Sequence, residues 1–594
     1  MRRRLIGVLT ATVLVASACN QAAATPSPSA NPSAGAAATA AARASSAAVA
    51  LNSSYRAVPA TTLGGKVVLA EWEFPQAINP YYALTETDVE ASDSMFDNLL
   101  NVTPDLKYTP DLATNIPTLD NGGVVLNGSG MDVTWRLRPG MEWSDGKPIN
   151  CDDIRATWQW VMDKDNAGLA AGTIGWQDVT GVDGGSGTDC VMHFGKVYEG
   201  YLTLVSPLLP AHYITTVPVR VAASQLYPLN SLASGVYSGP YIPVSVSGHA
   251  KMTLKPNPHW ETIGGHAPWL SSVTWKYYGD AATMIAGFQK GEFDLGQNLD
   301  NTNIPALTAI DASRKVVNPS LTYELLAFNN ASLQTKFGSD AAYIVDAIKL
   351  ATDRSAIASG PMGGNVIVSN NFVSPLEWYY TRIDRPTTAD PTTAFTLLAN
   401  AGWVKGPDGY VTKGGKTLEL TYCTTNNRQF RLDTFTLMAA QLKQIGIKVD
   451  VNIKPDLFGA WATTKPDTAC NLRHGNFDVA EFAYVSRFDP LTGYRIYHSS
   501  QIPDATHPFG ENISRASVPA LDAAYDAVAT NVDFAKVRDA MYAVQNLYGS
   551  DQNTYELPLY FRKDVWLVNS KLHNFDGNPT SSAAEWNIGD WWVG

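Results

Sequence analysis

Apolar positions along the chain follow two periods, one typical of helices and one typical of strands. From 432 to 445 apolar residues recur every three or four positions, which predicts a helix, and Gly446 can take the left-handed conformation that ends it. Residues 447–453 then alternate between apolar and polar, which predicts a half-buried strand. Another helix is predicted over 534–547, with Asp533 as its N-cap. This alternation indicates an α/β fold.

Two apolar runs predict buried strands that end in charged residues. KVVLAEW at Lys66–Trp72 is followed by Glu73, and FDVAEFAYVSRFDP at 477–490 ends with Arg487 and Asp489 close together. Short apolar runs of this kind are typical of strands in a protein interior. We therefore expect the second strand to bring an arginine and an aspartate to one place, where they meet either each other or a ligand.

Length and composition are those of a large globular protein. A chain of 594 residues exceeds what one hydrophobic core usually serves, which predicts two or more lobes. The net charge of -12 becomes -15 without the three arginines at positions 2–4, which argues against nucleic acid and against an anionic membrane surface as partners. The 16 Trp, 26 Tyr and 19 Phe supply rings that line ligand clefts as well as cores.

The N-terminus has the pattern of an export signal. Three arginines precede an apolar run from Leu5 to Val15, and three small residues then precede Cys19. This ending resembles a lipobox, in which the cysteine is diacylated and becomes the new N-terminus. Residues 1–18 would then be the signal peptide that is removed. The alternative is an ordinary signal peptide with an incidental cysteine.

Residues 19–62 predict a disordered tether between the lipid anchor and the folded region. Residues 20 to 62 consist mostly of Ala, Ser, Pro, Thr, Asn and Gly, with Arg43 and Arg56 the only charges. Such a composition does not bury enough apolar surface to fold. No other segment has the length and hydropathy of a membrane span, so we expect lipid to be the only attachment to the membrane and the location to be extracytoplasmic.

The remaining cysteines are Cys151, Cys190, Cys423 and Cys470, an even number in a chain predicted to be exported. Three pairings are possible, and proximity in sequence favours Cys151 with Cys190 and Cys423 with Cys470. A zinc site is the alternative, but the chain has no C-x-x-C and its nine histidines lack ligand spacing. We expect two disulfides, and neither a metal nor a cofactor.

Motifs for catalysis are mostly missing. Ser144 to Lys147 matches S-x-x-K, but no K-T-G follows and the central Asp-Gly favours a turn. Glu71 and Glu73 lie two apart on a predicted strand, as the paired carboxylates of a glycosidase would, although such pairs arise by chance in a chain with 55 acidic residues. The sequence favours a binding protein over an enzyme.

A series of short stretches follows in order along nearly all of the chain after residue 62. They are YTPDLATNIP from Tyr108, TWRLRPGMEWSDGKPINCDDIRATWQW from Thr134, SGPYIPV from Ser238, KMTLKPNPHWE from Lys251, FQKGEFDL from Phe288, LLAFNN from Leu325, IKLATDRSAIA from Ile348, LLANAGW from Leu397, LKQIGIKVDV from Leu442 and the stretch at 477–490. In this order they resemble the family 5 extracellular solute-binding proteins, the oligopeptide- and dipeptide-binding components of ABC importers.

The resemblance implies a two-lobed α/β fold like that of periplasmic binding proteins, of type II, cluster C. Lobe I would comprise 63–320 and 556–594, with an extra subdomain at about 98–212, and lobe II would comprise 321–555. The chain would cross between the lobes at LTYELLAFNN and at YELPLYFRKDV, and two crossings make a hinge. The lobes of a monomer would close on a peptide or another small molecule, without chemistry, and hand it to permease subunits.

The resemblance also raises a question about the ligand. In peptide-binding members the strand at 479–485 continues as Trp, two residues, then an Asp that pairs with the α-ammonium of the peptide. Here Tyr484 takes the place of that Trp and Arg487 or Ser486 the place of that Asp, depending on the alignment. Either another acid, Asp489 or Glu73, holds the amine, or the ligand presents a carboxylate, phosphate or hydroxyls to Arg487.

An oligopeptide is the favoured ligand, and an oligosaccharide stacked on Tyr82, Trp461 and Tyr484 is the alternative among binding proteins. A receptor without a permease and a secreted glycosidase are the alternatives outside transport. The predicted ligand-binding residues are Glu73, Phe74, Tyr82, Trp461, Tyr484, Val485, Ser486, Arg487 and Asp489.

Overall fold

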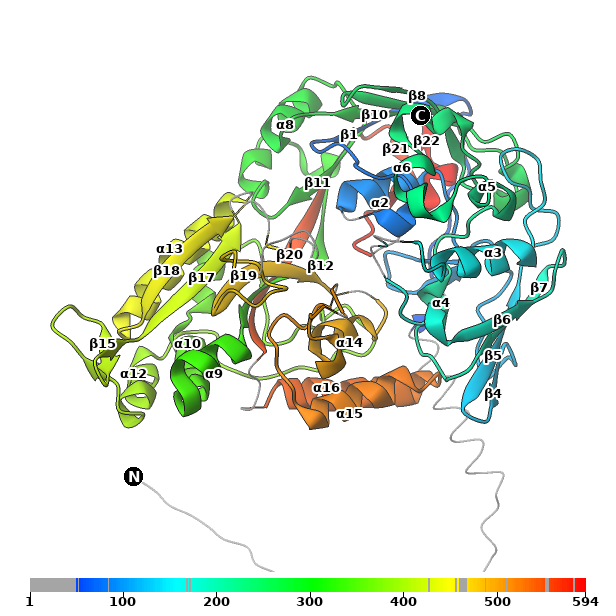
Figure 1. Ribbon diagram of the computed structural model, residues 1–594. Coiled ribbons are helices and arrows are strands. Elements are labelled where there is room, and N and C mark those ends of the chain that lie inside the picture. Colours follow the sequence, from blue (N-terminus) through cyan, green and yellow to red (C-terminus); the bar gives the residue numbers. More distant parts are fainter. Residues whose placement is uncertain are drawn as a thin grey trace, which may run out of the picture. The chain divides into compact units, whose positions relative to one another are not determined.

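One large mixed sheet runs through the protein (Figure 1). The computed structural model describes residues 50–594 except 52, 84, 167, 168, 170, 171, 426, 427, 455, 456, 459–466, 487, 506, 509, 551–554, 581 and 582. Cys19 and the signal segment lie outside the described residues. In spatial order the strands are β18 (Lys448–Lys454), β17 (Glu419–Thr425), β19 (Val479–Val485), β12 (Lys315–Phe328), β20 (Glu556–Val568), β11 (Leu295–Asp300), β1 (Gly65–Glu71), β10 (Leu270–Tyr277), β9 (Lys251–Pro256) and β8 (Tyr241–Ser247), and β13 (Ile367–Val368) also pairs with β20.

The long strands β12 and β20 connect the two parts of this sheet. Their antiparallel register is shifted between Pro319 and Tyr323, where one part of the pairing ends and the other begins. Strand β11 pairs with the C-terminal part of β20, and β19 pairs with the C-terminal part of β12. We call the part from β11 to β8 lobe I and the part from β18 to β19 lobe II. The stretches of the two predicted crossings fall on these strands, while the division into lobes at 320 and 555 stays a prediction.

Lobe I also carries a small antiparallel sheet, in the order β4-β5-β7-β6, within the predicted subdomain. A disulfide joins Cys151, at the start of α3, to Cys190 in β7, which confirms the first predicted pairing. The S-x-x-K stretch is a turn, because Trp143 N donates to Lys147 O and Gly146 has a φ of +80°. The elements are β4 (Val124–Asn127), β5 (Gly130–Arg136), β6 (Val179–Asp183), β7 (Asp189–Phe194), β2 (Leu100–Val102), β3 (Tyr108–Pro110), α2 (Glu86–Asp93), α3 (Cys151–Val161), α4 (Tyr201–Leu204), α5 (Ala211–Ile214), α6 (Ala222–Gln225), α7 (Glu261–Gly264) and α8 (Ala281–Gln289).

Lobe II packs helices against β17, β18 and β19. The predicted helix at 432–445 is α13, and Gly446 follows it with a φ of +86°. The predicted helix at 534–547 is α16, whose N-cap Asp533 accepts from Ala535 N and Lys536 N. A disulfide joins Cys423 to Cys470, which confirms the second pairing. The helices are α9 (Asn330–Phe337), α10 (Ala341–Ala351), α11 (Arg354–Ser359), α12 (Pro391–Asn400), α13 (Gln429–Gln444), α14 (Thr492–Tyr497), α15 (Pro519–Ala529) and α16 (Phe534–Tyr548), and a small sheet contains β14 (Val404–Lys405), β15 (Val411–Lys413) and β16 (Lys416–Thr417).

Residues 51–58 pack against the fold, although the sequence predicts a disordered tether as far as residue 62. Leu51 forms a bridge with Tyr108, and Ser54 N donates to Asp105 Oδ2 over 3.1 Å. The ring of Tyr55 packs edge-on against Trp586 with centroids 4.6 Å apart. Composition misled here because a few apolar and aromatic side chains, rather than the average polarity, hold this segment against the fold. In the part of the chain that the structure describes, no helix combines the length and the apolar character needed to cross a membrane.

Candidate functional site between the two lobes

The loop that follows β19 of lobe II packs against lobe I. Phe488 is buried in the core of lobe I, and its ring packs edge-on against Tyr108 with centroids 4.7 Å apart. Thr203 Oγ1, on α4, donates to Asp489 Oδ2 over 2.9 Å. Nearby, Glu199 N donates to Ala529 O over 3.1 Å. The end of β19 therefore lies directly at the contact between the lobes.

Two predicted residues at the end of β19 line a pocket. Val485 and Ser486 share this pocket with the aromatic side chains of Tyr323, Phe372 and Tyr379. Val485 keeps 48% of its surface exposed although its strand is buried at the other end. Aromatic walls beside an accessible strand end suit a ligand with apolar parts.

One edge of β19 is open where it reaches this pocket. The ladder with β12 continues to Val485, whereas the ladder with β17 ends at Ala480. Ser486 N donates to Leu321 O over 2.8 Å. Because the backbone N–H groups of successive residues in a strand point to opposite sides, the N–H of Val485 points away from β12, toward the open edge. Among the described strands, none pairs with β19 along that edge beyond Ala480.

Three carboxyl groups from both lobes meet beside the same strand end. We call Glu199, Glu377 and Asp489 the acidic junction. Ser486 Oγ donates to Glu377 Oε1 over 3.4 Å, but Glu377 Oε2 and Glu199 Oε2 are buried and have no hydrogen-bond donor within the described chain. Burial raises the pKa of Glu377 well above its usual value, and Asp489 raises it further. Burial and the carboxylate of Asp489 act in the same way on the pKa of Glu199.

A second contact between the lobes is rich in arginine. Arg428 of lobe II pairs with Asp300 of lobe I, with Nη1 3.2 Å from Oδ2, and its guanidinium lies 5.2 Å from the ring centroid of Trp72. The predicted residue Glu73 is half-buried here. Burial raises its pKa, while the positive charge of Arg428 opposes that rise. We call this contact, together with the network of Glu324, Arg431 and Arg562 described next, the arginine junction.

The connecting strands β12 and β20 carry a buried ionic network. The carboxylate of Glu324, on β12, is bound by Arg431 Nη2 at 3.1 Å and by Arg562 Nε, from β20, at 2.9 Å. Burial alone would raise the pKa of Glu324, but the two guanidiniums lower it to about 2. Because Arg562 and Glu324 lie on the two connecting strands, this pair braces the crossing itself.

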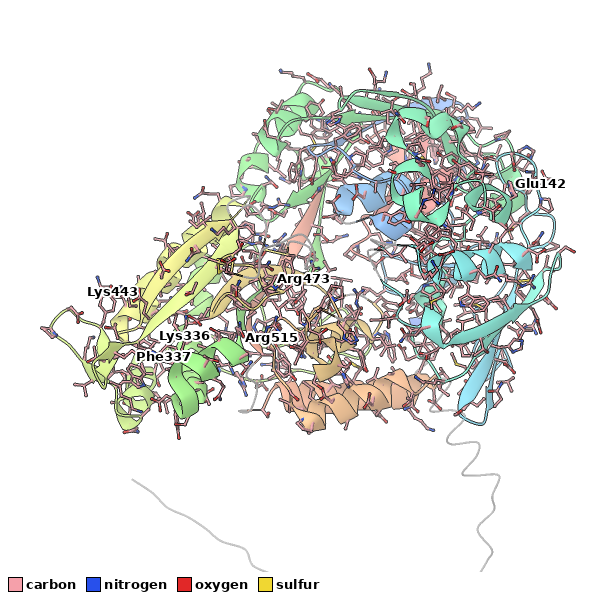
Figure 2. The ribbon with its side chains drawn as sticks, in the orientation of Figure 1. Glu142, Lys336, Phe337, Lys443, Arg473 and Arg515 are labelled. Atoms are coloured by element: carbon pink, nitrogen blue, oxygen red, sulfur yellow. A yellow bond between two sulfur atoms is a disulfide. The ribbon has the colours of Figure 1, made fainter. Side chains whose placement is uncertain are left out.

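Two further arginines of lobe II bond to main-chain oxygens. Figure 2 labels Arg473 and Arg515, and Arg515 donates to the carbonyl oxygens of Arg473 and Pro503. Arg473 donates to the carbonyl oxygen of Phe458, and its guanidinium also lies over the Phe458 ring. These bonds fix both side chains within lobe II.

The other predicted residues are not gathered at the junction. Phe74 stacks on His249, with ring centroids 4.5 Å apart, and Tyr82 is a buried residue of lobe I that donates to Asn166 Oδ1 over 2.6 Å. Tyr484 is half-buried in lobe II and donates to Glu511 O over 2.9 Å. Trp461 and Arg487 lie outside the described residues, so the predicted pairing of Arg487 with Asp489 is not described either.

Glu71 is not available as a catalytic carboxylate. Its side chain is fully buried and Oε1 accepts from Trp72 N over 2.7 Å and from Glu73 N over 3.2 Å. A group that caps a loop in the interior does not reach a substrate, so the Glu71–Glu73 pair does not form the site of a glycosidase.

The sequence analysis missed Glu199, Glu377, Thr203 and Arg428. Their contacts join residues between 109 and 286 positions apart, which no periodicity reveals. A local signal did exist, because VYEGY and PLEWYY each place one acid among aromatic residues. An acid in such surroundings is either buried or at a site.

Comparisons with known proteins agree with this architecture. Residues 107–502 match the family described as bacterial extracellular solute-binding proteins, family 5 Middle. The oligopeptide-binding protein AppA of Bacillus subtilis (strain 168) is 23% identical over 538 residues, covering 89% of this chain and 92% of that protein.

Solved structures show the same fold. AppA from Bacillus subtilis in complex with a nonapeptide superposes with a TM-score of 0.71 at 22% identity, covering 90% of this chain and 100% of that one. NikZ from Campylobacter jejuni in complex with Ni(L-His) also gives a TM-score of 0.71, at 19% identity, covering 90% and 100%. The fold is therefore the two-lobed α/β fold that the resemblance implies. This chain belongs to the bacterial extracellular solute-binding proteins of family 5.

Proposed function

We propose that this protein captures an oligopeptide between its two lobes and delivers it to the permease subunits of an ABC importer. Family membership supports the class, and the relative named above is an oligopeptide-binding protein. The observation that carries the peptide assignment is the open edge of β19 beside an aromatic pocket. An extended peptide adds to such an edge through main-chain hydrogen bonds, while pockets receive its side chains.

We also propose how the protein is attached to the membrane and that it catalyses no reaction. The protein acts as a monomer, without turnover, outside the cytoplasm, and a lipid on Cys19 holds it at the membrane. The pattern around Cys19 supports the anchor. Replacing Cys19 with Ala should release the protein into the medium or leave its signal uncleaved. A mutant that is cleaved yet stays in the membrane fraction would contradict the anchor.

A direct test identifies the bound molecule. Mass spectrometry of the small molecules released on denaturing the purified protein should detect peptides. Recovery of a sugar oligomer or a metal chelate instead would replace the peptide with another solute of the same transport class. Conversion of an added peptide into products would contradict the assignment as a binding protein.

A variant pair tests the mode of binding. Val485→Pro removes the N–H at the open edge but leaves the bond from Ser486 N to Leu321 O in place. Val485→Ala is the matched control, because it shortens the side chain and keeps the N–H. The proline variant should weaken binding of pentaalanine at least tenfold relative to the alanine variant, with both folded by circular dichroism. Equal affinities would contradict strand addition at β19.

A further inference from the structure

We propose that the acidic junction is a recognition site for a cationic group of the ligand, an ammonium or a guanidinium, held between Glu199 of lobe I and Glu377 and Asp489 of lobe II. This inference rests on the proposed function and names the charge of the ligand that the site selects. The three carboxyls come from separate segments, namely the loop before α4, the loop after β13 and the loop after β19.

Within the described residues, the acids of the junction have no basic partner. Glu377 is 4% exposed and its Oε2 has no hydrogen-bond partner in the described chain, and Glu199 Oε2 has none either. No ion pair within the described residues joins a lysine or arginine to any of the three acids. Arg495 is in electrostatic contact with the neighbouring Tyr198, but it pairs with Glu511 at 2.9 Å.

Unpaired buried carboxylates are unfavourable unless something neutralises them. Transferring an ionised carboxylate out of water has a large free-energy cost, and a proton or a cation removes it. Without ligand, a proton can serve, since Glu199 in its protonated form donates to the carboxylate of Asp489. With ligand, an ammonium or guanidinium supplies donors that match the open acceptor positions of Glu199 and Glu377.

The acidic junction lies beside the open edge of β19. Ser486 follows the open edge of β19 directly and donates to Glu377 Oε1 over 3.4 Å. Tyr379, two residues after Glu377, lines the same pocket as Val485 and Ser486. A ligand that lies along the edge of β19 thus has a carboxyl group within reach of its end. Contributions from both lobes mean that a bound cation favours the state in which the lobes meet.

Tyrosines of the described chain surround the acidic junction. They come from β3, the loop before α4, α4 and the loop after β13, and are Tyr108, Tyr198, Tyr201 and Tyr379. Burial and the neighbouring acids raise the pKa of each phenol, which keeps it neutral. These rings can also contact a cation through their faces.

Glu377→Gln and Glu199→Gln test the site, because each preserves shape and removes the charge. Glu585→Gln is the matched control, since Glu585 is also a buried carboxyl without a basic partner but lies within lobe I, beside Gln297. Asp489 is left unchanged because its Oδ1 also accepts from Leu491 N over 2.8 Å. Melting temperatures without ligand establish that each variant is folded.

Calorimetry with four probes then measures affinity. The probes are hexaalanine with a free amine, N-acetylhexaalanine, an N-acetylated hexapeptide that carries one lysine, and spermidine. The wild type should bind at least one cationic peptide tenfold or more tightly than N-acetylhexaalanine. Glu377→Gln and Glu199→Gln should each reduce that preference at least tenfold and change binding of N-acetylhexaalanine less than threefold. Glu585→Gln should change neither.

The four probes also distinguish an α-ammonium from a cationic side chain, and a failure of the cation site from a failure of peptide capture. A preference for free hexaalanine assigns the site to the α-ammonium, and one for the lysine peptide assigns it to a side chain. If peptides bind but both junction variants keep the wild-type preference, the cation site is refuted and peptide capture stands. If only spermidine binds, and only with intact junction residues, the cation site stands and peptide capture is refuted. If no probe binds, the cation site and peptide capture are both refuted for peptides and polyamines of these kinds.

Discussion

The acidic junction and the arginine junction both join lobe I to lobe II, but within the described residues only the arginine junction pairs its acids with guanidiniums. At the arginine junction Glu324 has two guanidiniums and Asp300 has one. At the acidic junction Glu199 and Glu377 have buried oxygens without a donor in the described chain. Complete ionic networks favour a structural role, whereas incomplete ones indicate that a partner is supplied from outside.

The largest expected difference concerns the same substitution at the two places. Glu324→Gln removes the charge that compensates Arg431 and Arg562, and leaving buried guanidiniums unpaired should cost about 3–5 kcal/mol of unfolding free energy. Glu377→Gln removes an acid without a basic partner, so its effect at neutral pH should be below about 1 kcal/mol or stabilising. Melting temperatures of both ligand-free variants test this, and equal losses would erase the distinction.

The pH dependence should have opposite signs in the two regions. The pKa of Glu324 is lowered to about 2, so its contribution is present above the ordinary value of about 4.3 and is lost as pH falls toward 2. The pKa values of Glu377 and Glu199 are raised, so their contribution is full below about 4.3 and is lost as pH rises through the folded-state values.

Thermal melts of ligand-free wild type, Glu377→Gln and Glu324→Gln between pH 3 and pH 9 measure these slopes. Each titrating group contributes at most about 1.4 kcal/mol per pH unit. Relative to the wild type, Glu377→Gln should lose part of the decline in stability at rising pH, and Glu324→Gln part of the decline in acid. Parallel curves for all three proteins would show that neither carboxyl has a shifted pKa.

A smaller effect is expected where the arginine junction contacts the other lobe. Arg428→Gln breaks the pair with Asp300 and should cost about 1–2 kcal/mol. Because that pair joins the lobes, small-angle scattering of the ligand-free protein should give a larger radius of gyration. Lys448→Gln, which breaks an exposed pair with Glu419 inside lobe II, is the control and should leave the radius unchanged. An unchanged radius for both would mean that Arg428 does not hold the lobes together.

The smallest effect sharpens the acidic junction. Thr203→Val removes one hydrogen bond to Asp489 and should cost about 1 kcal/mol. Hydrogen exchange should become faster around residues 200–204 and 489–492, because the bond joins the lobes. The control is Thr180→Val, because the hydroxyl of Thr180 donates to His193 O within lobe I. This variant should change hydrogen exchange locally but not at 489–492.

Local features were predictable from sequence because neighbouring residues determine them. The helix α16 begins after Asp533 as its cap predicts, and β19 spans the apolar run Val479–Val485. Both disulfides followed from short sequence separation, and the resemblance implied the crossing strands β12 and β20. These features depend on short-range physics or on an ordered series of motifs.

The composition of the site was less predictable, because it depends on which distant segments pack together. Tyr82 has the same amphipathic ring as a ligand platform, but the contact with Trp160 makes it a core residue. Glu71 lies on a strand face like a catalytic acid, but tertiary packing buries it. The aromatic neighbours of Glu199 and Glu377 in the sequence mark each acid singly, but that their loops meet at Asp489 depends on the tertiary fold. Roles for Arg487 and Trp461 stay predictions.

The attachment of residues 51–58 to lobe I limits how far the protein can reach. Val58 N donates to Asn574 Oδ1 over 3.0 Å, so the segment is fixed at both of its ends. With a lipid on Cys19, as proposed, only the chain from Cys19 to Ala50 separates the membrane from the fold, and it spans at most about 110 Å. The accessible volume around the anchor is then smaller than for a chain free to Leu63, which raises the effective concentration of a permease in the same membrane.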